Sequence, residues 1–128
     1  GRDKAFALIR ETLRNESDPE LYRVAAWILG RIGEPDDCRI LGSRLDDAED
    51  AMTRAYLHHS LAALGDEEGR RELRANLESD DPDIRTYAAV FAGDAGMSEA
   101  IPALIDLLDD EDLDVRVRAA QSLFVLSP

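Results

Sequence analysis

The stretch "AIPALIDLLDDEDLDVRVRAAQSL" (residues 100–123) decides the fold of this chain. Its apolar residues recur at three- and four-residue intervals from Ile101 to Leu108, which is the spacing of one helix face. Pro102 lies in the first turn of that helix, where a missing N–H is tolerated. After an acidic run, Asp112 stands where a carboxylate can cap the N–H groups of a second helix. The stretch therefore predicts two consecutive helices joined by an acidic turn.

The same pattern recurs along the whole chain, in blocks 18–33, 50–65, 81–96 and 112–127. An aspartate opens each block, and these residues lie 32, 31 and 31 positions apart: Asp18, Asp50, Asp81 and Asp112. An arginine follows four residues later in three of the blocks: Arg54, Arg85 and Arg116. A glycine closes three of them: Gly33, Gly65 and Gly96. Because several independent columns agree, the chain is built from internal repeats.

Each repeat reads as a pair of helices. Pro19 and Pro82 directly follow the opening aspartate, at the first helical position, where proline is favoured. The closing glycines are typical of the residue just past a helix C-terminus. We expect about eight helices in antiparallel pairs within a single domain, residues 1–128. Its predicted parts are a partial unit 1–17, full units 18–49, 50–80 and 81–111, and a partial unit 112–128.

The D-x-x-[VIL]-R-x-x-A-A run and the L-G-x-I-G-like ending resemble the HEAT repeat family, in its short phycobilisome-lyase-type branch. The resemblance implies an all-α fold, a right-handed α-α superhelix related to armadillo-like solenoids. It also implies that the first helix of each unit lies in the convex layer and the second in the concave layer. The second unit departs from the pattern: Leu57 and His58 replace the alanine pair, and Ala62 replaces Gly30 and Gly93. We therefore expect a looser or shifted helix crossing there.

The C-terminal segment "SLFVLSP" (122–128) is strongly apolar, and no partner helix follows it. Since the ends of a solenoid need covering, we expect a fragment of a longer protein or a docked end. End-to-end packing through this apolar helix is one such arrangement.

Composition narrows the classes of partner. The net charge of −13 opposes binding to phosphate backbones, so we expect no nucleic acid partner. No apolar run reaches the roughly 18 residues of a membrane span, and no membrane partner is expected. Cys38 is the single cysteine and is expected to be a small hydrophobic residue rather than a nucleophile. The compartment stays open, with the cytoplasm as the default expectation.

No pattern of chemistry-bearing residues indicates catalysis. Asp110, Asp112 and Asp114 imitate the start of a calcium-binding loop, but Val115 and Gln121 stand where that loop needs Gly and Glu. Helix capping explains these acids better. The adjacent histidines 58 and 59 point about 100° apart on a helix, so they cannot chelate one metal. We predict no catalytic, cofactor-binding or metal-binding residues and no cofactor.

The basic residues suggest two roles. The first group is the arginine column, made of Arg54, Arg85 and Arg116. These arginines are expected to be structural and to form ion pairs with aspartates of successive repeats. A second group lies on the predicted second helices and is expected to bind a partner protein on the concave face: Arg39, Arg44, Arg70, Arg71 and Arg74. Bidentate contacts from these residues would suit an acidic segment. The alternative is local pairing on one helix, through Asp66–Arg70, Glu67–Arg71 and Arg74–Glu78.

These observations favour a non-enzymatic scaffold that binds another protein, or another domain of the same protein, on its concave face. The resemblance implies one alternative, a subunit of a bilin lyase or isomerase complex that handles a chromophore.

Overall fold

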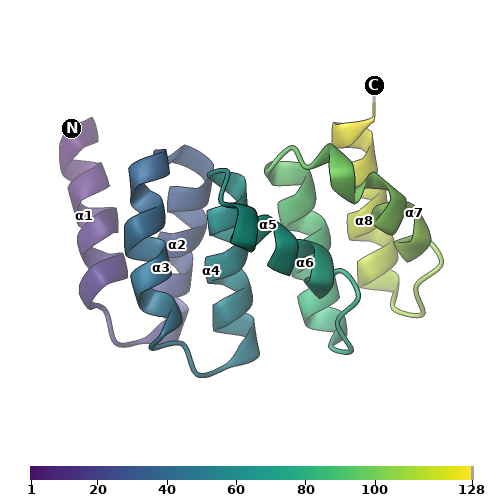
Figure 1. The fold of residues 1–128 in the computed structure, drawn as a ribbon, viewed down its shortest axis with the longest axis horizontal. Coiled ribbons are helices and arrows are strands. Elements are labelled where there is room, and N and C mark those ends of the chain that lie inside the picture. Colours follow the sequence, from purple (N-terminus) through teal and green to yellow (C-terminus); the bar gives the residue numbers. More distant parts are fainter. Residues whose placement is uncertain (128) are drawn as a thin grey trace.

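The computed structural model describes residues 1–127, which are helical throughout and contain no strand. They form eight α-helices joined by short loops (Figure 1). The helices are α1 (Arg2–Asn15), α2 (Pro19–Ile32), α3 (Cys38–Leu45), α4 (Ala51–Ala63), α5 (Glu67–Asn76), α6 (Pro82–Asp94), α7 (Ile101–Leu107) and α8 (Leu113–Leu126). Two short 3-10 helices, η1 (Pro35–Asp37) and η2 (Ser98–Ala100), precede α3 and α7.

The aspartate column caps the first helix of every repeat, as predicted. The side chains of the four aspartates accept backbone hydrogen bonds in the first turns of α2, α4, α6 and α8. A second capping column lies two residues earlier. Glu16, Ser79 and Asp110 each accept from the backbone N–H of the capping aspartate, at 3.0, 3.1 and 2.9 Å. Each acidic junction thus satisfies N–H groups that the helix cannot pair by itself.

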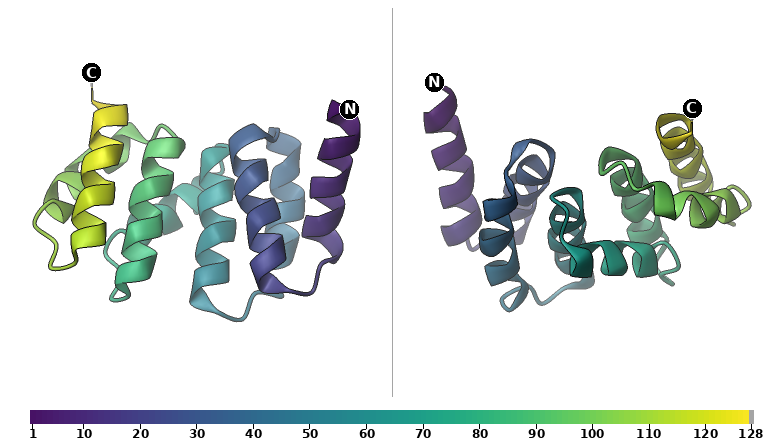
Figure 2. Two further views of the ribbon diagram at one scale, coloured as in Figure 1. Left: turned by 180° about the vertical axis from the view of Figure 1, so that it is seen from behind. Right: turned by 45° about the horizontal axis from the view of Figure 1, so that its top comes forward.

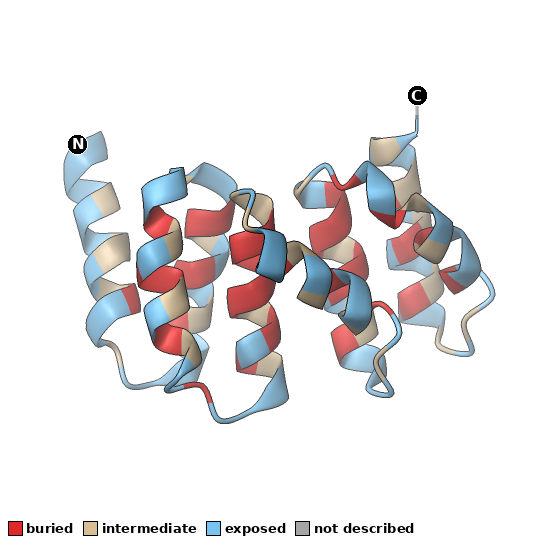
Figure 3. Ribbon diagram, viewed as in Figure 1, coloured by how far each residue is buried: buried red, intermediate tan, exposed pale blue. Residues whose placement is uncertain are grey.

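The helices form two layers, the arrangement of an α-solenoid. The first helices α2, α4, α6 and α8 form one layer, and the second helices α1, α3, α5 and α7 form the other (Figures 1 and 2). Buried residues concentrate where the layers meet, whereas most of α1 is exposed (Figure 3). Leucines from both layers fill this interior, among them Leu13, Leu29, Leu41, Leu57, Leu73, Leu77 and Leu104.

Small residues set the spacing within the layer of first helices. A Cβ added to Gly30 would lie 3.0 Å from Ser60 Cα, and one added to Gly93 would lie 2.5 Å from Ser122 Oγ. Helices α2 and α4, and helices α6 and α8, therefore approach closely. At the α4–α6 crossing, Ala62 and Phe91 occupy the corresponding positions. Helix α4 contacts α6 less extensively than α2 contacts α4. Within the second unit itself, however, α4 and α5 make the most extensive helix–helix contact of residues 1–127, so the expectation of a looser crossing in that unit was wrong.

The curvature of the layers corrects one expectation. The row of helices bends so that α2, α4, α6 and α8 lie on its concave side (Figure 2, right). Arg31 of α2 accordingly reaches Asp94 of α6, past the intervening α4, at 3.1 Å. The expectation that second helices line the concave layer was wrong. The glycine and serine contacts bring α2 close to α4 and α6 close to α8, and this closely spaced layer is the inner one.

The closing glycines act in two different ways. Gly65 and Gly96 adopt positive φ angles of 95° and 65°, as a residue past a helix C-terminus often does. Gly33 has a φ of −78° and does not follow this prediction. A Cβ there would clash with the Leu29 carbonyl oxygen and would lie 2.8 Å from Asp37 Oδ2, so both the end of α2 and the buried Asp37 carboxylate require a glycine at this position.

Candidate functional site on the concave face

A hollow of about 540 Å³ lies on the concave face. All four first helices contribute to its lining. Its aromatic residues are Trp27, Tyr56, Tyr87 and Phe91, and its charged residues are Asp83, Asp114 and Arg118. Because residues of all four first helices meet in this one recess, it is the candidate site.

Three aromatic rings of the hollow, those of Tyr56, Tyr87 and Phe91, form a connected cluster, and Trp27 lies apart from it. The rings of Tyr56 and Tyr87 lie 5.2 Å apart between centroids, and Tyr56 meets Phe91 edge-on at 5.6 Å. Burial, followed by the Tyr87 hydroxyl, raises the pKa of Tyr56 to about 12, so this phenol stays neutral. Phe91 is buried, while Trp27 and Tyr87 each keep 38% of their surface exposed. The cluster therefore offers fixed, half-exposed ring surfaces.

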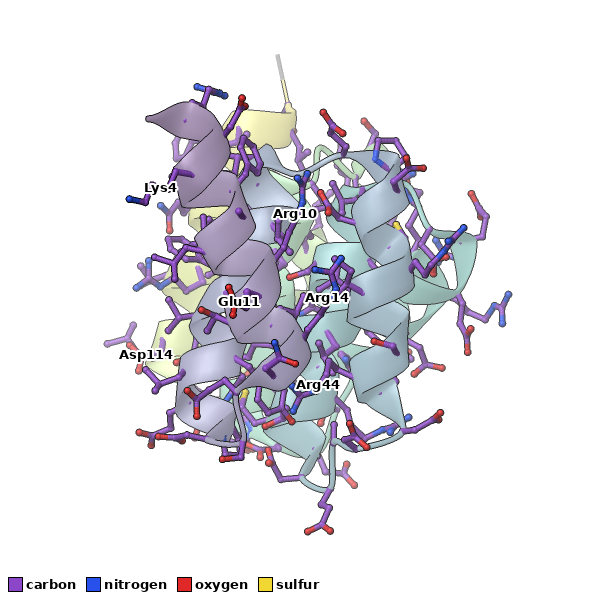
Figure 4. All side chains as sticks on the ribbon, turned by 90° about the vertical axis from the view of Figure 1, so that its left-hand side faces the viewer. Lys4, Arg10, Glu11, Arg14, Arg44 and Asp114 are labelled. Atoms are coloured by element: carbon purple, nitrogen blue, oxygen red, sulfur yellow. The ribbon has the colours of Figure 1, made fainter. Side chains whose placement is uncertain are left out.

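Charged groups of both signs surround these rings. The guanidinium of Arg23 lies 5.9 Å from the Tyr56 ring, and that of Arg31 lies 5.5 Å from the Trp27 ring. Such contacts hold cations against aromatic faces. Arg118 donates a hydrogen bond to Gln121 at 3.1 Å and lines the hollow together with Asp114. Figure 4 shows the Asp114 side chain pointing outward from the molecule. The sequence predicts no role for Arg118, whereas in the structure this residue lines the hollow.

The basic residues predicted to bind a partner all lie on α3 and α5, in the convex layer. The structure therefore does not bring them to the concave face. Arg70 and Arg74 both approach Glu99 of η2, at 3.2 and 3.8 Å, instead of the local partners considered above. Arg39 and Arg71 are exposed and have no ion-pair partner within residues 1–127.

Arg44 is buried and has a structural role. Its guanidinium donates to the Leu13 carbonyl at 2.7 Å and stacks 4.0 Å from the Tyr22 ring. In the next repeat, Arg54 donates to the equivalent carbonyl of Leu45 at 2.8 Å. Tyr22 stands where the arginine column has Arg54, so Arg44 supplies the missing guanidinium from the neighbouring helix. Figure 4 shows Arg44 below Arg10 and Arg14, on the side of α1 that faces α3.

The rest of the arginine column ties helices to loops. Arg85 binds Asp110 through two hydrogen bonds, at 2.9 and 3.1 Å, and Arg116 donates to the Asp110 carbonyl at 2.7 Å. Burial alone would raise the pKa of Asp110, but hydrogen bonds from Arg85 and from the Asp112 N–H hold it below its usual value. Arg10 binds the buried Asp37 in the same bidentate way. These arginines hold helices and loops together, but their partners are not the four aspartates that open the repeats.

Comparison with known proteins agrees with this geometry. Residues 43–123 match the sequence profile of HEAT repeats. The chain belongs to the HEAT repeat family. It is also 36% identical over 100 residues to a phycocyanobilin lyase subunit alpha of Thermosynechococcus vestitus, an alignment that covers 78% of this chain. The chain spans only 30% of the length of that relative.

Both histidines of this HEAT repeat chain are buried, although they point in different directions from helix α4. His59 Nε2 lies 3.0 Å from Asn76 Nδ2, whereas its Nδ1 atom has no hydrogen-bond partner within residues 1–127. Burial, followed by the neighbouring His58, lowers the pKa of His59 to about 3. His59 is therefore a neutral residue of the interior.

Within residues 1–127, no group of three or more His, Cys, Asp or Glu is arranged to hold a metal ion. None of the helices in these residues combines the length and apolarity needed to cross a membrane. Cys38 is half-buried against the core, and burial raises the pKa of its thiol, which disfavours the thiolate form needed for nucleophilic chemistry.

Proposed function

We propose that this HEAT repeat chain is a non-enzymatic interaction module that binds a segment of another protein, or another domain, in its concave hollow. The observation that carries the proposal is the group of partly exposed aromatic side chains Trp27, Tyr56 and Tyr87. Trp, Tyr and Arg dominate the energetics of protein interfaces because they offer large rigid surfaces at low entropic cost. The Tyr56 and Tyr87 rings contact each other, and the Arg31 guanidinium lies over the Trp27 ring, so little ordering is needed when a partner binds.

The polar groups of the hollow suit recognition rather than catalysis. The Thr86 hydroxyl donates to the Pro82 carbonyl at 2.9 Å and contacts no base. Neither histidine lines the hollow. Asp83, Asp114 and Arg118 at its margin offer hydrogen bonds to a peptide backbone or to charged side chains.

Affinity capture from the source lysate, quantified by mass spectrometry, tests the proposal. Three forms are compared: the unchanged chain, Trp27→Ala with Tyr87→Ala, and Arg39→Ala with Arg71→Ala. We expect the aromatic variant to lose the specific partner, with an affinity loss of at least about 30-fold for a cost of about 2 kcal/mol. Undiminished recovery by this variant would overturn the concave-face version. Loss in the arginine variant alone would instead support the exposed arginines of the convex face as a site for an acidic segment.

A second candidate function is chromophore handling. The observation in its favour is that Arg118 and Arg23 border an aromatic recess, in a chain similar to a phycocyanobilin lyase subunit. A flat conjugated ligand with carboxylates would stack on the rings and pair with the guanidinium groups. Absorbance titration of a bilin against the unchanged chain and the Trp27→Ala variant tests this, and an unchanged bilin spectrum would remove the candidate.

A further inference from the structure

The concave hollow contains a row of residues that occupy equivalent positions in the four first helices. Each residue of this row lies six positions after the aspartate that caps its helix, and each lines the hollow: Val24, Tyr56, Tyr87 and Arg118. The row crosses the concave side of the molecule from α2 to α8 (Figure 2, right). Two tyrosines therefore stand side by side at the centre of the hollow.

Two aromatic rings of the hollow already carry a guanidinium group of the chain itself. Arg23 lies 5.9 Å from the centre of the Tyr56 ring, and Arg31 lies 5.5 Å from that of Trp27. Arg31 also pairs with Asp94 at 3.1 Å. The ring faces of this hollow thus hold cations, and the guanidinium groups contributed by α2 are already engaged.

Tyr87 differs from these two rings. It keeps 38% of its surface exposed, and no arginine or lysine of residues 1–127 lies over its ring. Asp83 precedes it by four residues and lies one turn away on the same face of α6. Asp114 occupies the position of Asp83 in α8, and both aspartates line the hollow. Since neighbouring helices pack roughly 8–10 Å apart, one basic side chain placed between α6 and α8 can reach both carboxylates.

The two carboxylates are not neutralised by the chain. Neither Asp83 nor Asp114 forms an ion pair within residues 1–127. Arg118, the basic residue of the lining, donates to the neutral side chain of Gln121 at 3.1 Å. The charge that this part of the hollow offers to a partner is therefore negative. The net charge of −13 adds a long-range field of the same sign, which attracts cations.

We propose that the segment bound in the concave hollow is basic, and that one of its arginine or lysine side chains lies on the Tyr87 ring between Asp83 and Asp114. This inference rests on the proposed function and names the chemistry of the partner. The face of the ring attracts a cation, and the carboxylates supply charge-assisted hydrogen bonds to it. Apolar residues next to the basic one contact Trp27 and Val90. An acidic segment would instead bring like charges together, which suppresses binding.

Selection of peptides tests the chemistry of the partner. Random dodecapeptides displayed on phage are selected on the immobilised chain, and clones that also bind the Trp27→Ala, Tyr87→Ala double variant are discarded. We expect the remaining clones, which need the two rings, to be enriched in arginine or lysine. Ring-dependent clones without a basic residue would overturn this inference and leave the proposed function standing. The absence of ring-dependent clones would overturn both.

The affinity of a selected peptide tests the two carboxylates. Trp27 is the single tryptophan of the chain and lines the hollow, so its fluorescence reports binding there. Asp83→Asn with Asp114→Asn should weaken the peptide at least about tenfold, because two charge-assisted contacts are lost. Asp46→Asn with Asp106→Asn removes the same charge from exposed positions of the second layer, and should weaken it less than about twofold. Equal losses in the two variants would show long-range attraction alone and overturn the placement.

A double-mutant cycle tests the contact itself. Replacing the basic residue of the peptide by glutamine should weaken binding to the unchanged chain and have little further effect on the Asp83→Asn, Asp114→Asn variant, because residues in contact are not additive. Full additivity would mean that the basic residue lies elsewhere, and would overturn the proposal. Circular dichroism checks that each variant is folded.

Discussion

At the scale of single residues, the arginines show that a repeat can keep an interaction while changing the residue that makes it. In two successive repeats, a guanidinium donates a hydrogen bond to a backbone carbonyl at the C-terminal end of a second helix. Arg44 donates to the Leu13 carbonyl, and Arg54 donates to the Leu45 carbonyl. Cations are favoured at this end of a helix. Tyr22 stands where the other repeats have an arginine. Arg44 supplies the missing guanidinium, so the Leu13 carbonyl still accepts a hydrogen bond.

Replacing Arg44 by methionine should destabilise the fold by about 1–3 kcal/mol, because the buried Leu13 carbonyl loses its donor. The apolar stem is kept, so the loss reports on the hydrogen bond and the stacking on Tyr22. Chemical denaturation measures the free energy of unfolding. Arg39→Met is the control: it lies in the same helix, is exposed, and should change stability by less than about 0.5 kcal/mol. Equal effects of the two substitutions would contradict the role given to Arg44.

His59 should make the free energy of unfolding depend on pH, in the window between its folded and unfolded pKa values. Its pKa is about 3 in the folded chain and rises to its ordinary value of 6.5 on unfolding. Below pH 6.5 the unfolded chain therefore binds a proton that the folded chain refuses, and the free energy of unfolding falls by about 1.4 kcal/mol per pH unit. Asp37 and Asp110, with lowered pKa values, contribute only below about pH 4.

The His59→Leu variant isolates this contribution. Denaturation at several pH values between 4.5 and 7 should show a shallower slope than in the unchanged chain, with only the smaller part from His58 remaining. An identical slope would show that His59 is protonated within the fold.

Sequence alone predicted which residues cap helices but not which residues pair. The caps follow from local rules, because the Asp50 carboxylate accepts from the Thr53 N–H only three residues away. Ion pairs depend on loops that meet across repeats. Arg85 reaches Asp110 over 25 residues, and Arg70 prefers Glu99 to Asp66 because helix α5 turns that face toward η2.

At the scale of elements, glycine decides how closely helices cross. In α5, a Cβ on Gly69 would lie 2.6 Å from both the Ala62 nitrogen and the His58 oxygen of α4. Backbone atoms cannot move aside easily, so Gly69→Ala should cost about 1–3 kcal/mol through overpacking. Gly42, inside α3, has open space around its Cα. Gly42→Ala should instead stabilise by about 0.5–1 kcal/mol through helix propensity. Thermal melting of both variants checks the opposite signs, and a tolerated Gly69→Ala would show that α5 can move away from α4.

Helix positions were predictable at this scale, whereas the direction of bending was not. Periodic apolar residues and caps mark each helix locally. Curvature depends on how closely the helices of one layer approach each other, and the contacts of Gly30 with Ser60 and of Gly93 with Ser122 bring the first helices close. Phe91 breaks the first pattern at α4–α6, and it contributes the ring that joins the aromatic cluster. The hollow was missed because Trp27, Tyr56 and Tyr87 belong to three different repeats.

At the scale of the whole molecule, the interior divides into two apolar clusters. One contains Leu13, Leu29, Leu41 and Leu57 and is built from α1 to α4. The other contains Leu73, Leu77, Met97 and Leu104 and extends from the end of α4 to α8. Only α4 contributes to both, and the α4–α6 contact is the least extensive between neighbouring first helices. In repeat proteins, stability is a sum of unit and nearest-neighbour terms, so this junction should divide the chain.

Native-state hydrogen exchange should reveal these two clusters as separate opening units. Leu104→Ala removes a fully buried side chain from the second cluster, at a cost of about 2–5 kcal/mol. Amide exchange should accelerate in α6, α7 and α8 while α1, α2 and α3 keep their protection, because openings of one cluster leave the other folded. Leu41→Ala should give the converse pattern. Uniform acceleration along the chain in both variants would mean that α4 transmits stability across the junction and that the molecule opens only as a whole.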